Sequence, residues 1–272
     1  MSAYDPAVAL DFFKAAGKPE SIAQGATIFE EHEKTNALLF QRAKMYLLME
    51  GEVDLVARKK VIGTVGKGEI FGEMASLTQA PRTASAVAKS ACSVIALDDK
   101  QFHLGLKAKP AFALMLMSMM IGRLRETIEK LEGTETLSAA GAVKESAVFD
   151  AKRLAELVAG MTDDPPVYFD RGKVIVREGQ AGLRMYVVIE GRVAVSVTGR
   201  VVERLGPGGV FGELALLEQA PRLASVFAET DCQVLPVNRE SFLQLVKMSP
   251  EFAASLLGRL AERLKVLTAK LK

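Results

Sequence analysis

The chain is poor in residues on which several classes of protein depend. Its 272 residues include no tryptophan, two cysteines and two histidines, and its net charge is only +2. Two cysteines are too few for a disulfide scaffold or for an iron–sulfur cluster with four cysteine ligands. Their scarcity is typical of a reducing compartment, so we expect a cytoplasmic protein. The small net charge argues against a strongly basic nucleic-acid-binding face.

Long hydrophobic runs are also missing. The longest, FALMLMSMMIG at 112–122, is too short to span a bilayer, so we expect no membrane span. The first residues, MSAYDPAVALDFF, lack the basic stretch and apolar core of a signal peptide. No kinase signature, catalytic triad or metal-ligand cluster is present, so we expect no catalytic residues, no metal, no cofactor and no enzymatic activity.

The chain does contain one sequence unit that occurs twice. FGEMASLTQAPRTAS at 71–85 and FGELALLEQAPRLAS at 211–225 agree at 11 of 15 positions, at an offset of 140 residues. The same offset relates Met45-Tyr46 to Met185-Tyr186 and Cys92 to Cys232. A period this long is not a solenoid repeat. It indicates two homologous domains, which we place at 1–132 and 147–272, with a Gly-, Ser- and Ala-rich linker at 133–146.

Both units have the same order of predicted elements. Short apolar runs rich in β-branched residues and divided by glycine, at 45–57 and 185–197, predict strands of a small antiparallel barrel or sandwich. An amphipathic helix is expected at 149–161, and a longer helix is expected to close each unit, at 111–131 and 251–271. We expect the two cysteines to pack in the cores.

The repeated segment has the chemistry of a sugar-phosphate pocket. Gly72 and Gly212 allow close approach of the backbone, and a helical turn after each would point N–H groups at an anion. Arg82 and Arg222 follow prolines and suit two phosphate oxygens. A carboxylate at Glu73 or Glu213 accepts well from ribose hydroxyls. Small residues leave space for the bound group.

These two segments closely resemble the phosphate-binding cassette of cyclic-nucleotide-binding domains, a family that includes the catabolite activator protein and protein kinase A regulatory subunits. The resemblance covers nearly the whole chain, twice. It implies an α+β fold of two jelly-roll-like β-barrel domains, each flanked by helices and closed by a long helix.

By that resemblance the arginines bind the cyclic phosphate of cAMP or cGMP, the glutamates bind the ribose 2′-hydroxyl, and backbone groups complete each cradle. The expected ligand-binding residues of the first domain are Gly72, Glu73, Met74, Ala75, Arg82, Thr83 and Ala84. Those of the second are Phe211, Gly212, Glu213, Leu214, Ala215, Arg222, Leu223 and Ala224.

The two units differ in ways that bear on binding. The first has about seven extra residues upstream of its cassette, within 28–51, and no glycine in the turn where the second has VREGQAG. Thr83 can bond a purine base where Leu223 cannot, and threonine at this place is frequent in family members that respond to cGMP. We therefore expect the second site to prefer cAMP and the first to tolerate or favour cGMP.

Both closing helices carry apolar residues at alternating spacings of three and four, typical of coiled-coil seams. The seam residues are Leu114, Met117, Ile121, Leu124, Ile128 and Leu131, and then Leu257, Leu260, Leu264, Leu267 and Leu271. They predict association within one chain, as a pseudo-dimer, or between two chains in a homodimer. Ligand binding would shift a closing helix between two positions and so change the affinity for an unknown protein partner.

No helix-turn-helix follows the second closing helix, so we expect no nucleic-acid partner. Two alternatives to a cyclic-mononucleotide receptor remain open. One is a cyclic-dinucleotide sensor, because Arg259 and Arg263 have an RxxxR spacing on the last helix. The other is a scaffold in which both cassettes are degenerate and bind nothing.

Overall fold

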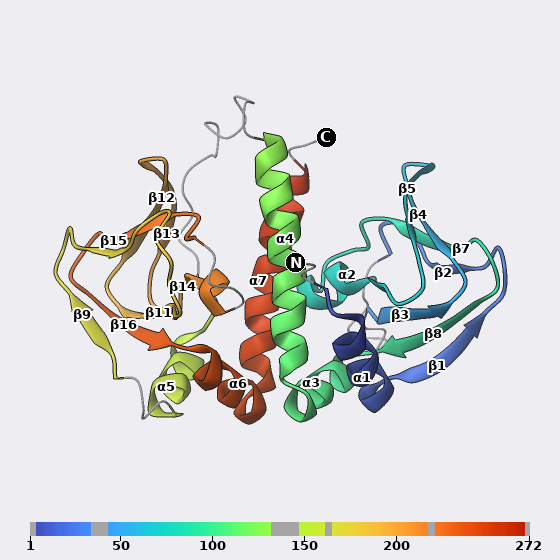
Figure 1. Ribbon diagram of the computed structural model, residues 1–272, viewed down its shortest axis with the longest axis horizontal. Coiled ribbons are helices and arrows are strands. Elements are labelled where there is room, and N and C mark those ends of the chain that lie inside the picture. The colour runs from blue at the N-terminus through green and yellow to red at the C-terminus, as the bar shows by residue number, and fades with distance from the viewer. Residues whose placement is uncertain (1–3, 34–42, 132–146, 161–164, 217–220, 270–272) are drawn as a thin grey trace. The chain divides into compact units, whose positions relative to one another are not determined.

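The computed structural model describes residues 4–33, 43–131, 147–160, 165–216 and 221–269. The chain divides into two compact units. Unit 1 comprises Met1–Met119 and Ser249–Arg263, and unit 2 comprises Met120–Met248 and Leu264–Lys272. Each unit contains one β-barrel (Figure 1).

The barrel of unit 1 consists of two antiparallel sheets with the strand orders β1-β8-β3-β6 and β2-β7-β4-β5. Its strands are β1 (Lys18–Ile22), β2 (Thr27–Phe29), β3 (Met45–Glu50), β4 (Val53–Ala57), β5 (Lys60–Val65), β6 (Ile70–Phe71), β7 (Ser85–Ala88) and β8 (Cys92–Leu97). Every pairing between them is antiparallel. The predicted strand pair at 45–57 is confirmed as β3 and β4, which turn at Gly51 with a φ of 92°.

The barrel of unit 2 repeats this arrangement, with the strand orders β14-β11-β16-β9 and β10-β15-β12-β13. Its strands are β9 (Val167–Phe169), β10 (Val174–Val176), β11 (Met185–Glu190), β12 (Val193–Val197), β13 (Arg200–Leu205), β14 (Val210–Phe211), β15 (Ser225–Ala228) and β16 (Cys232–Val237). Equivalent residues pair in the two barrels: Tyr46 lies opposite Phe71, and Tyr186 lies opposite Phe211. The duplication is therefore preserved at the level of strand register.

Helices flank the barrels. They are α1 (Pro6–Ala16), α2 (Glu73–Thr78), α3 (Asp99–Ala108), α4 (Ala111–Leu131), α5 (Ala151–Gly160), α6 (Arg239–Met248) and α7 (Pro250–Ala269), together with the 3-10 helix η3 (Glu213–Leu216). Helix α1 begins where Asp5 accepts from the N–H groups of Ala7 and Val8, with proline as its first residue. The expected closing helices correspond to α4 and α7, and the expected helix at 149–161 corresponds to α5.

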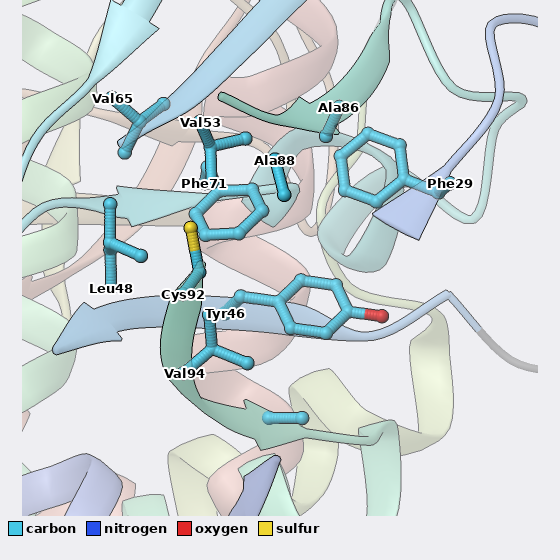
Figure 2. Packing of buried hydrophobic residues seen from close by; sticks show 11 residues of the cluster. Phe29, Tyr46, Leu48, Val53, Val65, Phe71, Ala86, Ala88, Cys92 and Val94 are labelled. Carbon is cyan, nitrogen blue, oxygen red and sulfur yellow. The ribbon is translucent and has the colours of Figure 1, made fainter. Parts of the chain in front are cut away.

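Each barrel has its own apolar core. In the first, Tyr46 and Phe71 stack with ring centroids 5.1 Å apart, beside Phe29, Val53 and Cys92 (Figure 2). The equivalent pair in the second, Tyr186 and Phe211, lies 5.2 Å apart. Cys92 and Cys232 are both unbonded to another cysteine and buried, as predicted, so they act as small apolar residues.

The described seam residues of the closing helices are buried: Leu114, Met117, Ile121 and Leu124 in α4, and Leu257, Leu260 and Leu264 in α7. The side chains of Ile128, Leu131, Leu267 and Leu271 lie outside the described residues. The predicted α+β fold with two jelly-roll-like barrels is confirmed. The boundaries placed at the 133–146 linker stay a prediction, as does dimer formation.

The turn after β2 differs from its counterpart after β10 at one backbone position. Residues 32 and 179 are equivalent, because the N–H of each donates to the carbonyl of the cassette arginine at 2.9 Å. Gly179 has a φ of 78°, and His32 adopts a φ of 65°. A side chain in this left-handed region costs about 1–2 kcal/mol, so the first turn keeps its shape at the expense of strain.

We predict that His32→Gly stabilises the first barrel. Relief of strain exceeds the entropy that glycine adds to the unfolded chain, which leaves a net gain of about 0.5–1 kcal/mol. Gly179→Ala, where an added Cβ meets no atom within 4 Å, should cost a similar amount through strain alone. Thermal unfolding of both variants measures the two shifts. A midpoint for His32→Gly at or below that of the parent would contradict the interpretation.

Candidate functional site

Both cassettes begin at a glycine in a left-handed conformation. Gly72 (φ 75°) follows β6 and precedes α2, and Gly212 (φ 76°) follows β14 and precedes η3. The helical turn expected after each glycine is therefore present. An added Cβ at Gly72 would lie 2.8 Å from Nη1 of Arg82, and one at Gly212 would lie 2.5 Å from Nη1 of Arg222. The missing side chain makes room for the guanidinium at this point of each cassette.

The arginine of the first cassette is buried and bonded to two backbone carbonyls. Arg82 is only 5% exposed. Its Nη1 donates to the carbonyl of Gly72 at 2.8 Å, and its Nη2 donates to the carbonyl of Lys44 at 2.8 Å. The guanidinium carbon also lies 3.9 Å from the centre of the Phe29 ring. Arg82 thereby ties the start of the cassette helix to the start of β3.

The second cassette repeats this geometry. Arg222 is 7% exposed, and it donates from Nη1 to Gly212 at 2.8 Å and from Nη2 to the carbonyl of Arg184 at 2.7 Å. A guanidinium carries five N–H donors, of which two form these carbonyl bonds. Each arginine is therefore held in one orientation while retaining donors for an anion.

What packs against the guanidinium differs between the sites. Arg82 stacks on Phe29, a contact worth roughly 0.5–2 kcal/mol. Arg222 instead faces Gly182, where an added Cβ would lie 2.3 Å from Nη2 and 2.6 Å from Nε. The segment of the first domain that corresponds to Gly182, within 34–42, lies outside the described residues.

Burial disfavours the charged form of the arginine in each site. Burial lowers the pKa of the Arg82 guanidinium. The charges of Tyr46, Glu33 and Glu73 raise this pKa and so oppose the effect of burial. Burial likewise lowers the pKa of Arg222, which Tyr186 and Glu213 oppose. Arginine nevertheless stays protonated in proteins. A buried cation of this kind favours an anion that reaches it.

The two cassette glutamates are not equally buried. Glu73 is 4% exposed in the first turn of α2, whereas Glu213 is half-buried in η3. Both lie next to the glycine whose carbonyl the arginine bonds. A carboxylate and a guanidinium therefore flank one short turn in each barrel, as the sequence suggested.

The other expected residues differ in how far they are buried. Ala75, Ala84 and Phe211 are buried, and Met74 and Ala224 are half-buried. Thr83 and Leu223, which follow the arginines, are exposed. The side chains of Leu214 and Ala215 lie outside the described residues. Thr83 and Leu223 therefore add little to the core.

Sequence reasoning missed four contributors to the site. The backbone carbonyls of Lys44 and Arg184 accept hydrogen bonds from the arginines. Any residue type has such a carbonyl, so the sequence does not indicate them. The sequence indicates only that Phe29 is apolar, and its contact with Arg82 is seen in the structure alone. A further contributor is Glu31, whose N–H donates to Ser85 Oγ at 2.8 Å while its Oε2 accepts from the N–H of Arg58 at 2.8 Å.

The second barrel has the same bridge. The N–H of Glu178 donates to Ser225 Oγ at 3.0 Å, and its Oε2 accepts from the N–H of Thr198 at 3.0 Å. Each cassette serine is therefore linked through a glutamate to the hairpin between the fourth and fifth strands of its barrel. These bridges hold the strand that follows each arginine.

Among the described residues, no group of three histidine, cysteine, aspartate or glutamate side chains could hold a metal ion. No single described helix is long and apolar enough to cross a membrane; Asp99–Ala108 and Ala111–Leu124 reach that length only together, with a bend of 114° between them.

Two stretches of the chain, residues 19–107 and 166–249, match the cyclic nucleotide-binding domain family. They contain both cassettes and cover more than half of the sequence. The chain belongs to this family, with two copies of its domain.

Among curated proteins, the chain is 29% identical to a cAMP-dependent protein kinase regulatory subunit of Eremothecium gossypii, over 74% of this chain and 39% of that protein. It is 30% identical to the one of Yarrowia lipolytica, over 74% of this chain and 48% of that protein. The chain thus spans less than half the length of these two relatives.

Solved structures include similar chains. The regulatory domain of Toxoplasma gondii PKA with cAMP is 25% identical, with 93% of this chain and 88% of that chain covered and a TM-score of 0.32. The Thermus thermophilus catabolite activator protein is 30% identical, with 45% and 59% covered and a TM-score of 0.39. The family assignment depends on the sequence match and not on these scores.

We predict that Gly182→Ala displaces the Arg222 guanidinium from its two carbonyls. The φ of Gly182 lies outside the left-handed range, so the new Cβ acts through contact and not through backbone strain. Loss of hydrogen bonds from a charged donor should cost about 1.5–3 kcal/mol, measured as a lower midpoint of thermal unfolding.

The matched control is Gly63→Ala, because Gly63 also has an unstrained φ and its added Cβ meets nothing within 4 Å. This variant should unfold close to the parent's midpoint. Equal midpoints for Gly182→Ala and Gly63→Ala would mean that Gly182 does not position the arginine.

Proposed function

We propose that the protein is a cyclic-mononucleotide receptor with two binding sites, a regulatory protein and not an enzyme. One observation carries this proposal: each barrel buries an arginine against the glycine that starts a short helical turn, and a glutamate follows that glycine. The arginine supplies donors for a phosphate, the turn supplies N–H groups, and the carboxylate accepts from a hydroxyl. A cyclic nucleotide presents these groups together.

The proposed ligand changes the bonds that each arginine makes. A cyclic phosphate binds the N–H donors of Arg82 and Arg222 that the carbonyls leave open, and its charge draws each guanidinium toward it and weakens the carbonyl bonds. Because Lys44 and Arg184 stand at the start of β3 and β11, ligand binding would alter the link between cassette and barrel. The ligand shifts the population between two arrangements according to its differential affinity for them.

The output of this switch is proposed to be a protein partner. The curated relatives are regulatory subunits of cAMP-dependent protein kinases, and a protein kinase is therefore the class of partner that we propose. The closing helices α4 and α7 are proposed to transmit the change, since they follow the barrel strands in each repeat. The cytoplasm is the proposed location.

We predict that Arg222→Leu weakens cAMP binding at the second site by well over tenfold, because removal of one partner from a buried charge pair costs about 2–5 kcal/mol. Arg82→Leu should do the same at the first site. Glu213→Ala should reduce affinity less and mainly abolish discrimination against the 2′-deoxy analogue. Titration calorimetry of the single variants and of the double arginine variant separates the two sites.

Arg200→Leu is the control, because Arg200 is an exposed arginine of the same barrel. It should leave cAMP affinity unchanged. An Arg222→Leu protein that binds cAMP as tightly as the parent at both sites would defeat the assignment. Tight binding of a cyclic dinucleotide with none of cAMP would favour the alternative sensor, and no binding of either would favour a scaffold.

We predict a difference in base preference at the residue after each arginine. The hydroxyl of exposed Thr83 can bond the exocyclic amino group of guanine, which adenine lacks at that edge, and Leu223 offers no such bond. Thr83→Ala should lower the ratio of cGMP to cAMP affinity at the first site by about three- to tenfold. Leu223→Thr should raise that ratio at the second. An unchanged ratio in both variants would assign base choice to other residues.

A further inference from the structure

The hairpin between β4 and β5 has a composition that the core of its barrel does not require. Its residues 58–62 read RKKVI, and all five are exposed. Val61 is 60% exposed and Ile62 is 62% exposed. The hairpin projects from the edge of its sheet (Figure 1), where β5 is the outermost strand. Three cations and two large aliphatic side chains thus share one convex tip.

The backbone of this tip is strained at two positions. Ala57 pairs with Lys60, so Arg58 and Lys59 form a two-residue turn, and both have positive φ, 50° and 63°. Turns of this type prefer asparagine and glycine. Long cationic side chains at both central positions are costly, and such strain is often found at functional sites.

The equivalent hairpin of the second barrel provides a comparison within the chain. It has the same two-residue turn, but its central residues are Thr198 and Gly199, which contribute no charge. Val201, the counterpart of Val61, is half-buried, and Val202, the counterpart of Ile62, is 37% exposed. The second tip thus has one exposed cation, Arg200, and one exposed aliphatic side chain, whereas the first has three cations and two exposed aliphatic side chains.

We propose that the β4–β5 hairpin tip, residues 58–62, contacts an anionic membrane surface and inserts Val61 and Ile62 among the lipid headgroups. Each cation near such a surface strengthens binding by about fivefold, so Arg58, Lys59 and Lys60 together contribute on the order of 100-fold. Cations alone give weak, salt-sensitive attraction, and the two aliphatic side chains supply the second, apolar signal. The contact is peripheral and reversible.

The shape of the tip favours a bilayer over a protein partner. A stable protein–protein interface takes roughly 20–30 residues from each side and has aromatic residues at its centre. Five residues at a convex turn, without an aromatic side chain, fall well short of this. A fluid headgroup layer can instead surround a small tip on all sides. The carboxylate of Glu31 bonds to this tip, where it accepts from the backbone N–H of Arg58.

The test is sedimentation of the full chain with phosphatidylcholine vesicles, with and without about 30% phosphatidylserine. We expect binding at least about tenfold stronger with phosphatidylserine, and weaker at higher salt. Lys59→Glu with Lys60→Glu should remove most of this binding. Val61→Ser with Ile62→Ser should reduce it by about fivefold or more, because the inserted apolar area is lost.

Arg200→Glu with Val202→Ser, in the second hairpin, is the matched control and should bind as the parent does. Lys59→Gly separates binding from folding: it should raise the thermal midpoint by relieving strain and weaken vesicle binding by about fivefold. Failure of the parent chain to sediment with anionic vesicles would overturn the proposal. So would parent-like binding by both double variants of the tip, and parent-like binding by Val61→Ser with Ile62→Ser alone would refute insertion.

Discussion

A buried guanidinium that must be satisfied organises each half of this protein. A cation removed from water is costly unless its hydrogen bonds are replaced, and here backbone carbonyls from two separate segments replace them. To reach those carbonyls the arginine needs a glycine without a Cβ beside it, a turn of fixed shape and a strand that starts at a defined place. The conformation of the cassette follows from this one requirement.

The same requirement is met with different neighbours in the two barrels. An aromatic ring covers Arg82, whereas Gly182 lies against Arg222. Glu33 contributes a carboxylate to the surroundings of Arg82, and the corresponding residue of the second barrel is the neutral Gln180. Duplication has therefore preserved the hydrogen bonds of the arginine and changed its electrostatic setting.

Much of the fold and the site could be predicted because the determining signals are local and occur twice. The glycine after Phe71, the arginine after Pro81 and the apolar strands at 45–57 are properties of short segments, and the repeat at 140 residues removes much ambiguity. The carbonyls of Lys44 and Arg184 could not be predicted, because a backbone acceptor has no sequence signature. His32 illustrates a second limit: the absence of glycine suggested an altered turn, but hydrogen bonds to Arg82 force histidine into the glycine conformation.

The division of the chain into compact units has a consequence for how the two repeats came to share one polypeptide. Unit 1 takes Ser249–Arg263 from the second repeat, and unit 2 takes the residues of α4 from Met120 onward from the first. A single ancestral copy with the same division would have needed another molecule to supply these helical residues. Fusion of two copies makes that supply intramolecular, so completion of each unit no longer depends on protein concentration.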